Sequence, residues 1–353
     1  MKKGILRIIF VNFLSVLIVI YSFSFCFKNY NVKGYEKEVI TLKKETIESE
    51  KKIEKEETKK EETNSSVSSE NENKVTSSQT KEKVNQVSAK AIKGNIISQY
   101  NSPYKAPLSY DGVYVKNNTS LKINIKKYLE GKIKFKIEKN SQPQVLILHT
   151  HATESFMLED SDVYTEDFKP RSTDNSKNMV AIGNEVANIL NNAGIKTVHS
   201  KVQHDYPNYT GSYNRAAETI NYYLKKYPSI KVILDLHRDS VSNGNDKVKL
   251  VTEINGKKAA QVMLVMGSQS DGVTNFPKWE ENFKLAVKLQ QNIEKSYPTL
   301  ARPVYLMPKI YNQNITTGSL LIEFGTDGNT LNEAVYSAKM VGKSIVKTLN
   351  ELG

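Results

Sequence analysis

The chain has 353 residues, one cysteine and a formal net charge of +12 at pH 7. A single cysteine excludes a disulfide within the chain. The excess of Lys and Arg over Asp and Glu would suit nucleic acid, but the N-terminal segment predicts a location outside the cytoplasm, where an anionic polymer or a membrane surface is the better electrostatic partner.

The first feature along the chain is an uncharged, almost wholly apolar stretch at 8–27, preceded by Lys2, Lys3 and Arg7. Roughly 20 such residues are enough to cross a bilayer as a helix, and the positive flank stays in the cytoplasm. A cleaved signal peptide would end in small residues, whereas this stretch ends in phenylalanines. We therefore predict a single-pass anchor in the cell membrane over 1–28, with a cytoplasmic N-terminus and the rest of the chain extracytoplasmic.

Lys, Glu, Ser, Thr and Asn dominate the segment that follows the anchor. Such a composition buries too little apolar surface to offset the loss of chain entropy on folding. We predict a disordered, charged tether over 29–109. The remaining residues, 110–353, are numerous enough for one large α/β domain.

Three short apolar runs in this domain are each followed by side chains that bind metals or transfer protons. The runs cover Val145–Leu148, 232–236 and 320–322, and the side chains that follow them are His149, His151, His237 and Glu323. Short apolar runs are typical of buried strands in parallel sheets, and ligands bind beyond the carboxyl ends of such strands. We expect these side chains to converge at one edge of the sheet.

Helical and strand patterns alternate through the domain. Apolar residues recur with helical spacing before the capping Gly194, and alternating apolar residues flank the turn pair Asn255 and Gly256. The predicted helices are 179–193, 213–227, 278–297 and 331–349, the predicted additional strand is 195–199, and the predicted antiparallel pair is 248–267 at a sheet edge. Together they indicate an α/β fold with a mostly parallel, twisted sheet flanked by helices.

Imidazole and carboxylate side chains at the predicted edge suit zinc. A catalytic Zn²⁺ site uses three protein ligands and keeps one position open, and this donor set favours zinc over other divalent ions. Either His149 or His151 could supply the first imidazole, and His237 the second. His199 and His204 fall in another loop, and we interpret them as surface groups.

Several stretches resemble the stage II sporulation protein P family, which comprises membrane-anchored peptidoglycan hydrolases of endospore-forming bacteria. They are 145–156, 235–240, 311–314 and 320–330. The resemblance extends from about residue 112 to the C-terminus and keeps the motifs in order. It implies a zinc-dependent N-acetylmuramoyl-L-alanine amidase with endopeptidase activity, related in fold to cell-wall amidases and acting on septal peptidoglycan during engulfment.

The resemblance also implies roles for individual residues. His151 would be the first metal ligand, His237 the second, and Glu323 the general base. The acidic ligand would be Asp174, just before the predicted helix at 179–193. Glu154 is the alternative, because it stands three residues after His151, a spacing found in zinc carboxypeptidases.

Arg238 directly follows His237 and is a candidate catalytic residue. Its guanidinium could stabilise an oxyanion or bind a substrate carboxylate. It could equally point away and pair with Asp239, because side chains alternate along a strand.

The resemblance implies partners as well, namely the lytic transglycosylase stage II sporulation protein D and the membrane protein M of the same complex. Two other functions remain open: a scaffold of that complex without hydrolytic activity, and a zinc peptidase that acts on a protein. An intact Glu323 favours an enzyme, because a pure scaffold needs no base beside the metal.

Overall fold

The computed structural model describes residues 91–140 and 142–352, so the predicted anchor at 1–28 and most of the predicted tether lie outside the described residues. Within those two ranges, no helix combines the length and the apolar character needed to cross a membrane.

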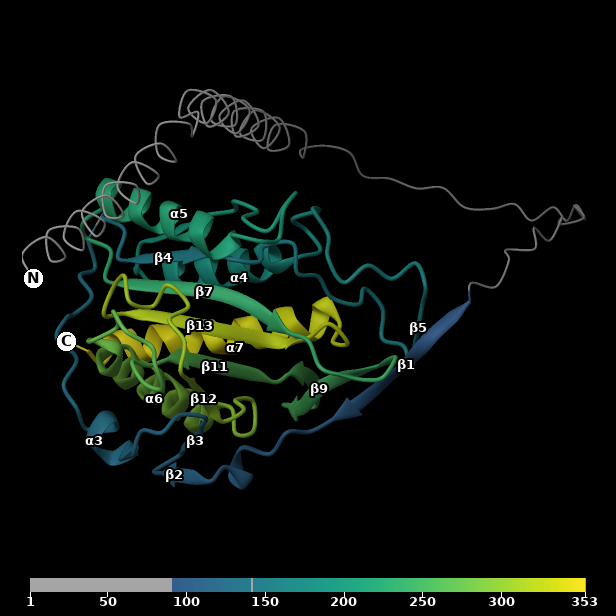
Figure 1. Ribbon diagram of the computed structural model, residues 1–353, viewed down its shortest axis with the longest axis horizontal. Helices are drawn as coiled ribbons and strands as arrows, with labels where there is room; N and C mark the ends of the chain where they lie inside the picture. Colours follow the sequence, from purple (N-terminus) through teal and green to yellow (C-terminus); the bar gives the residue numbers. More distant parts are fainter. Residues whose placement is uncertain (1–90, 141, 353) are drawn as a thin grey trace, which may run out of the picture. The chain divides into compact units, whose positions relative to one another are not determined.

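The centre of the domain is an eight-stranded sheet with the strand order β2-β3-β12-β11-β13-β7-β4-β6 (Figure 1). Its strands are β2 (Leu108–Tyr110), β3 (Val113–Asn117), β4 (Val145–Leu148), β6 (Thr197–His199), β7 (Val232–Asp239), β11 (Val262–Gly267), β12 (Val304–Met307) and β13 (Ser319–Thr326). Adjacent strands are parallel except in the pairs β2–β3 and β11–β13, which are antiparallel. The predicted α/β class is confirmed, whereas the parallel character is only partial.

Strand β4 ends at Leu148, as predicted, but β7 and β13 continue past their apolar runs. Parallel pairing between these two strands runs on through the polar residues, and His237 lies directly opposite Glu323. A polar side chain does not end a strand if its backbone groups still pair and its side chain faces a pocket. The two residues therefore lie within strands, on one face of the sheet, and not beyond the strand ends.

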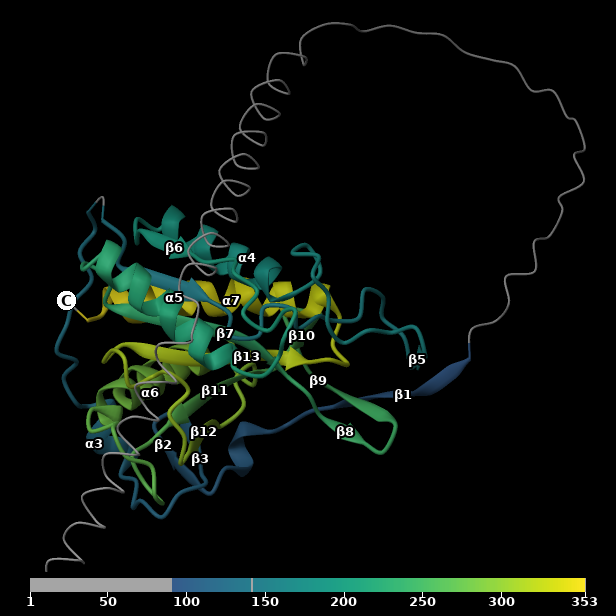
Figure 2. The ribbon, with the colours of Figure 1, turned by 45° about the horizontal axis from the view of Figure 1, so that its top comes forward.

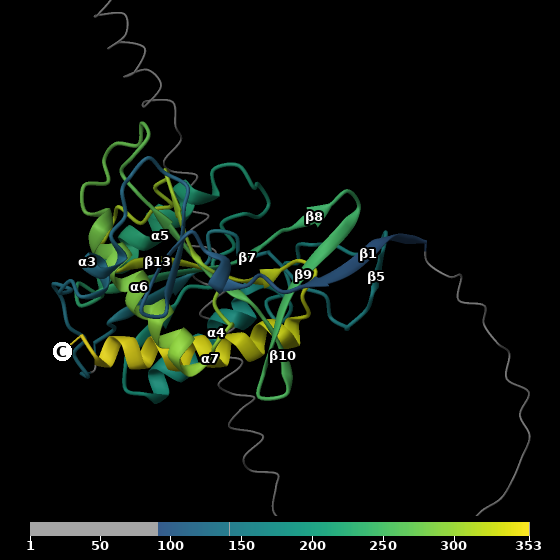
Figure 3. The same ribbon diagram turned by 90° about the horizontal axis from the view of Figure 1, so that it is seen from below.

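Three long helices pack on one face of the sheet and one packs on the other. On the first face lie α4 (Met179–Asn192), α6 (Trp279–Ser296) and α7 (Leu331–Asn350), with α7 packed on both of the others. Alternate residues of the central strands, such as Leu234 and Ile322, join their core. On the opposite face α5 (Ser212–Lys226) packs on β4 through Leu146, Leu148 and Ile220. Figure 3 shows α5 and α7 on opposite sides of the sheet.

Each of the four predicted helices is present, with ends within one residue of the prediction. Local capping explains the boundaries. The side chain of Asn178 accepts a hydrogen bond from the backbone N–H of Val180 at the start of α4, and Thr330 and Glu333 form a capping box at the start of α7. A further short helix, α3 (Ile125–Leu129), packs against α6.

The predicted antiparallel pair is confirmed in β9 (Asp246–Ile254) and β10 (Lys257–Ala260). Asn255 and Gly256 both have positive φ, as a two-residue hairpin turn requires. The hairpin does not lie at an edge of the main sheet, however. It belongs to a second sheet of order β10-β9-β1-β5, with β8 (Ser242–Asn243) also on β9 (Figure 2).

The second sheet corrects the predicted boundary of the tether. Strand β1 (Ile92–Gln99) pairs in parallel with β9 and antiparallel with β5 (Val163–Thr165), and the short 3₁₀ helix η1 (Pro103–Lys105) follows it. These residues lie inside the predicted tether, yet Ile96 is buried. The local composition does not indicate a strand here, because the strands that pair with β1 lie far along the chain.

Substitution of Ile96 tests this correction. Ile96→Asp should lower the free energy of unfolding by about 3 kcal/mol, because it removes a buried side chain and places a charge among apolar groups. Ile92→Asp is the matched control in the same strand, where the side chain is 65% exposed. Urea unfolding followed by tryptophan fluorescence measures both, and equal effects would show that β1 is not packed in solution.

Candidate functional site

The partly covered face of the sheet carries the candidate site. His237 on β7 and Glu323 on β13 are neighbours in register on this face. The turn after β4 adds His151 and Glu154, and the first turn of α5 adds Ser212. Segments far apart in the sequence therefore meet where α5 leaves the sheet uncovered.

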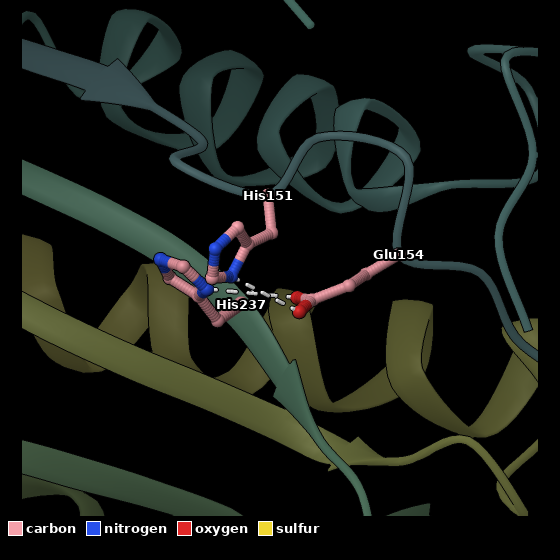
Figure 4. Close-up of side chains that lie close together, drawn as sticks. All are labelled: His151, Glu154 and His237. Carbon is pink, nitrogen blue, oxygen red and sulfur yellow. Dashed lines mark ion pairs between the residues drawn. The ribbon is translucent and has the colours of Figure 1, made fainter. Parts of the chain in front are cut away.

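His151, Glu154 and His237 form a compact, buried cluster (Figure 4). The Nδ1 atom of His151 lies 3.3 Å from Oε1 of Glu154, and the Nδ1 atom of His237 lies 3.5 Å from Oε2. The potential ligand atoms of all three residues lie within 4.8 Å of one another. Two imidazole nitrogens and one carboxylate are a donor set that zinc accepts, so the cluster fits the metal that the sequence analysis expected.

Neighbouring groups hold both imidazole rings from their outer side. Nε2 of His237 lies 2.9 Å from Oδ1 of Asp235, and Asp235 accepts hydrogen bonds from the N–H and hydroxyl of Thr150. Nε2 of His151 lies 3.1 Å from the hydroxyl oxygen of Ser212. Both rings present Nδ1 to Glu154 and have a carboxylate or hydroxyl oxygen close to the opposite nitrogen, an arrangement that is common among metal-binding histidines.

The charges in the cluster stabilise one another. Burial by itself raises the pKa of Glu154, but the contacts with His151, His237 and Arg238 outweigh it and hold that pKa below its usual range. Burial likewise lowers the pKa of His237, yet Asp235 and Glu154 outweigh it and raise that pKa well above 6.5. Glu154 is thus a carboxylate at neutral pH. The surroundings of His237 favour a positive charge on its ring.

Glu323 differs from Glu154 in its surroundings. Burial raises its pKa to about 8, with nearby carboxylates adding to the effect. Its Oε2 atom is buried without a hydrogen-bond partner among the described residues. A buried carboxylate that is free to accept or donate a proton beside the cluster has the properties of a general acid or base.

These groups line a pocket of about 450 Å³. Tyr209, Tyr213 and Tyr311 form much of its wall, and the Tyr209 ring stacks on His151 at 4.8 Å between centroids. The loop that carries Tyr311 is fixed to β11 through Gln313, whose side chain accepts from the N–H of Gly267 and donates to the carbonyl of Val265. The motif at 311–314 therefore shapes the pocket wall.

The structure does not bring Asp174 to the cluster. This carboxylate is exposed and accepts hydrogen bonds from the N–H and hydroxyl of Ser176, and it forms an ion pair with Lys177 at 2.9 Å. It stabilises the turn before α4, whose first N–H groups are already capped by Asn178. The expectation for Asp174 is corrected in favour of Glu154, the alternative with the shorter spacing from His151.

His149 also lies outside the cluster. Its ring is buried away from the cluster. Nδ1 lies 2.9 Å from the carbonyl oxygen of Leu236, and Nε2 lies 2.8 Å from Nε2 of His199. Burial lowers the pKa of His149 to about 4. The interpretation of His199 and His204 as surface groups is wrong, since His199 pairs with His149 and His204 is buried with Nδ1 2.7 Å from the carbonyl oxygen of His149.

The second expectation for Arg238 holds in part, because its guanidinium donates to the backbone carbonyl of Asp239 and not to its carboxylate. The guanidinium also donates to the backbone carbonyls of Ser155 and Pro170. Its backbone N–H donates to Oε2 of Glu154 at 3.1 Å. Arg238 therefore fixes the loop after β4 and orients Glu154.

Sequence reasoning missed Arg171 and Asp235. Arg171 lines the pocket, pairs with Asp205, lies over the Tyr209 ring at 4.8 Å and has Nη2 3.8 Å from Oε1 of Glu154. No local pattern around Arg171 indicates this position. Asp235 did carry a signal, because an aspartate inside an apolar strand requires a buried partner.

Comparisons with known proteins agree on a family. The model of the family described as Stage II sporulation protein P (SpoIIP) matches residues 21–346. "Stage II sporulation protein P" of Bacillus subtilis (strain 168) is 33% identical over 206 residues, covering 55% of this chain and 48% of that protein. The chain thus spans about half the length of the curated relative it matches.

Solved structures give weaker likenesses. N-acetylmuramoyl-L-alanine amidase AmiC2 of Nostoc punctiforme is 14% identical with a TM-score of 0.35, covering 61% of this chain and 97% of its own. An N-acetylmuramoyl-L-alanine amidase from Clostridium difficile 630 is 17% identical with a TM-score of 0.35, covering 60% and 97%.

The zinc content of two variants tests whether Glu154 or Asp174 is the acidic metal ligand. Glu154→Gln should lower the zinc retained after dialysis by 10-fold or more, because it removes a ligand charge from the cluster. Asp174→Asn is the matched control and should retain zinc as the wild type does. Elemental analysis of both variants decides the matter, and the opposite pattern would restore Asp174 as the ligand.

The buried neutral ring of His149 predicts a pH effect on stability. Its pKa is about 4 when folded against 6.5 unfolded, so the unfolded chain takes up a proton first and the wild type loses stability as the pH falls from 6.5 toward 4. His149→Gln lacks this loss. The free energy of unfolding of the wild type should therefore fall by about 2 kcal/mol more than that of the variant between pH 7 and pH 5.

Urea unfolding at both pH values measures this difference, and groups that do not interact with His149 cancel. A difference that stays constant or widens toward pH 5 would show that His149 is not held neutral in the folded protein.

Proposed function

Because the chain belongs to the stage II sporulation protein P family, we propose that it is a peptidoglycan hydrolase of sporulation, a zinc-dependent N-acetylmuramoyl-L-alanine amidase with endopeptidase activity. The observation that carries the proposal is the position of Glu323. A second carboxylate, with a buried oxygen that has no hydrogen-bond partner within 91–140 and 142–352, lies in register with His237 and lines the same pocket as the metal-type cluster. This is the combination that metal-assisted hydrolysis requires.

His151, Glu154 and His237 would hold the zinc ion. When bound, the ion lowers the pKa of water and polarises the scissile carbonyl. Asp235 keeps His237 in the orientation that presents Nδ1, and the backbone N–H of Arg238 does the same for Glu154. These supporting contacts are formed before substrate binds, so the ligands need little rearrangement.

Glu323 would act as the general base. It takes a proton from the attacking water and delivers it to the departing amine of L-alanine as the bond to the lactyl carbonyl breaks. A carboxylate usually too weak as a base becomes stronger when burial raises its pKa, here to about 8. The endopeptidase activity would use the same residues on a peptide bond of the stem.

The proposal also includes the cellular location of the enzyme, its substrate and its partners. The apolar stretch at 8–27 with its positive flank supports a single-pass anchor and an extracytoplasmic hydrolase. Septal peptidoglycan during engulfment would be the substrate. The lytic transglycosylase stage II sporulation protein D and membrane protein M would be the partners, and a scaffold without hydrolysis would have no use for Glu323.

Glu323→Gln tests the proposed mechanism. The variant should retain zinc but release peptides from purified peptidoglycan about 10²- to 10⁴-fold more slowly, because it loses the base and not a ligand. Glu218→Gln, an exposed position on α5, is the control and should behave as the wild type. Chromatography of released peptides, with the transglycosylase added, measures the rate.

A Glu323→Gln variant that cleaves as fast as the wild type would refute the assignment of the base. A wild type that binds zinc and releases nothing would favour the scaffold.

A further inference from the structure

A second pocket of about 310 Å³ adjoins the candidate active site. Asp239 lines both pockets, so the two share a wall. Besides Asp239 on β7 and Met263 on β11, three segments build the second pocket: the stretch after β1 that includes Lys105, the strand β3 with Lys116, and the start of β12 with Arg302 just before it. None of these residues takes part in the hydrolysis proposed above.

The second pocket lies on the same face of the sheet as His237 and Glu323. Met263 on β11 lines it and is the cross-strand neighbour of Glu323. One strand further, Tyr305 on β12 lines it and pairs in register with Lys116 on β3. The intervening residues of these strands, such as Leu264 and Val304, enter the core on the other side. A ligand could therefore extend from the first pocket into the second across adjacent strands.

The lining of the second pocket is strongly basic. Its charged residues are Lys105, Lys116, Arg302 and Asp239, three cations against one carboxylate. Arg302 is 5% exposed and uses Nη2 to pair with Asp239 at 2.9 Å, while its Nε is buried without a hydrogen-bond partner in ranges 91–140 and 142–352. A buried guanidinium with an unused donor is costly unless an acceptor reaches it.

The two lysines have no acidic partner in the described part of the chain. Lys105 and Lys116 are both exposed, and Nζ of Lys116 lies 5.1 Å from the centre of the Tyr305 ring. The one carboxylate of the lining is already paired with Arg302. The pocket therefore presents uncompensated positive charge to whatever enters it, and a carboxylate is the natural ligand.

We propose that this pocket binds the carboxylates of the peptide stem of peptidoglycan while the stem's first amide bond lies at Glu323. The proposal rests on the proposed function. From β13 through β11 and β12 to β3 there are three strand spacings, or about 14 Å. Four extended residues span about 13 Å, which is close to this separation, so a four-residue stem bound at Glu323 brings its far end to the mouth of the second pocket, toward which long lysine side chains can extend.

The experiment compares two ligands on the full chain. One is a synthetic stem tetrapeptide, and the other is the same peptide with every carboxyl group converted to the carboxamide. Calorimetry on the wild type should show about tenfold tighter binding of the carboxylate form. In Lys105→Gln/Lys116→Gln the preference should fall to about twofold or less, while Lys116→Arg should retain most of it.

Lys343→Gln is the matched control, because Lys343 is exposed on α7 on the opposite face of the sheet. It should keep the full preference. With a muramoyl tetrapeptide as substrate, the double variant should raise KM about fivefold or more and leave kcat unchanged, since only binding is lost.

The outcomes separate this proposal from the proposed function. A wild type that binds both peptides equally, or a double variant that keeps the preference as Lys343→Gln does, overturns the pocket assignment even if peptidoglycan is hydrolysed. A lysine-dependent preference in a protein that hydrolyses nothing supports the pocket and refutes the hydrolase.

Discussion

The site depends on the parallel pairing of β7 with β13. The register of this pair sets His237 opposite Glu323, and the two-residue period of a strand turns both side chains to the same face. A shift of one residue in either strand would send one of them into the core formed with α6 and α7. The opposite face stays partly open because α5 packs on β4 and does not extend over β13. Sheet register and incomplete helix cover thus create a pocket where ionisable groups can meet.

Polar groups in the middle of a sheet are costly, and the structure offsets the cost with mutual pairing. Asp235 faces His237, His237 faces Glu154, and Glu154 also accepts the backbone N–H of Arg238. Glu323 alone has a buried oxygen without such a partner among the described residues near the pocket. This oxygen of Glu323 can accept a proton. In the adjoining basic pocket, Nε of Arg302 likewise has no hydrogen-bond partner in the described part of the chain.

Much of the fold follows from local patterns. Helical periodicity located four helices within one residue at each end, and Asn255 with Gly256 located the hairpin, because capping and turn chemistry are short-range. His151 and His237 were also indicated by their places after apolar runs. Strand β1 could not be found in this way, since only its pairing with β9 and β5 distinguishes it from the polar segment around it.

The sequence by itself determined the four long helices, the hairpin and the residue types that are available to bind a metal, because these depend on neighbours along the chain. The tertiary structure alone decided which candidates meet. It placed Glu154 in the cluster and left Asp174 in a solvent-exposed turn, it directed His149 to His199, and it turned the guanidinium of Arg238 to backbone carbonyls. These outcomes depend on the path of the loop after β4 and on packing against strands distant in sequence, neither of which spacing along the chain specifies.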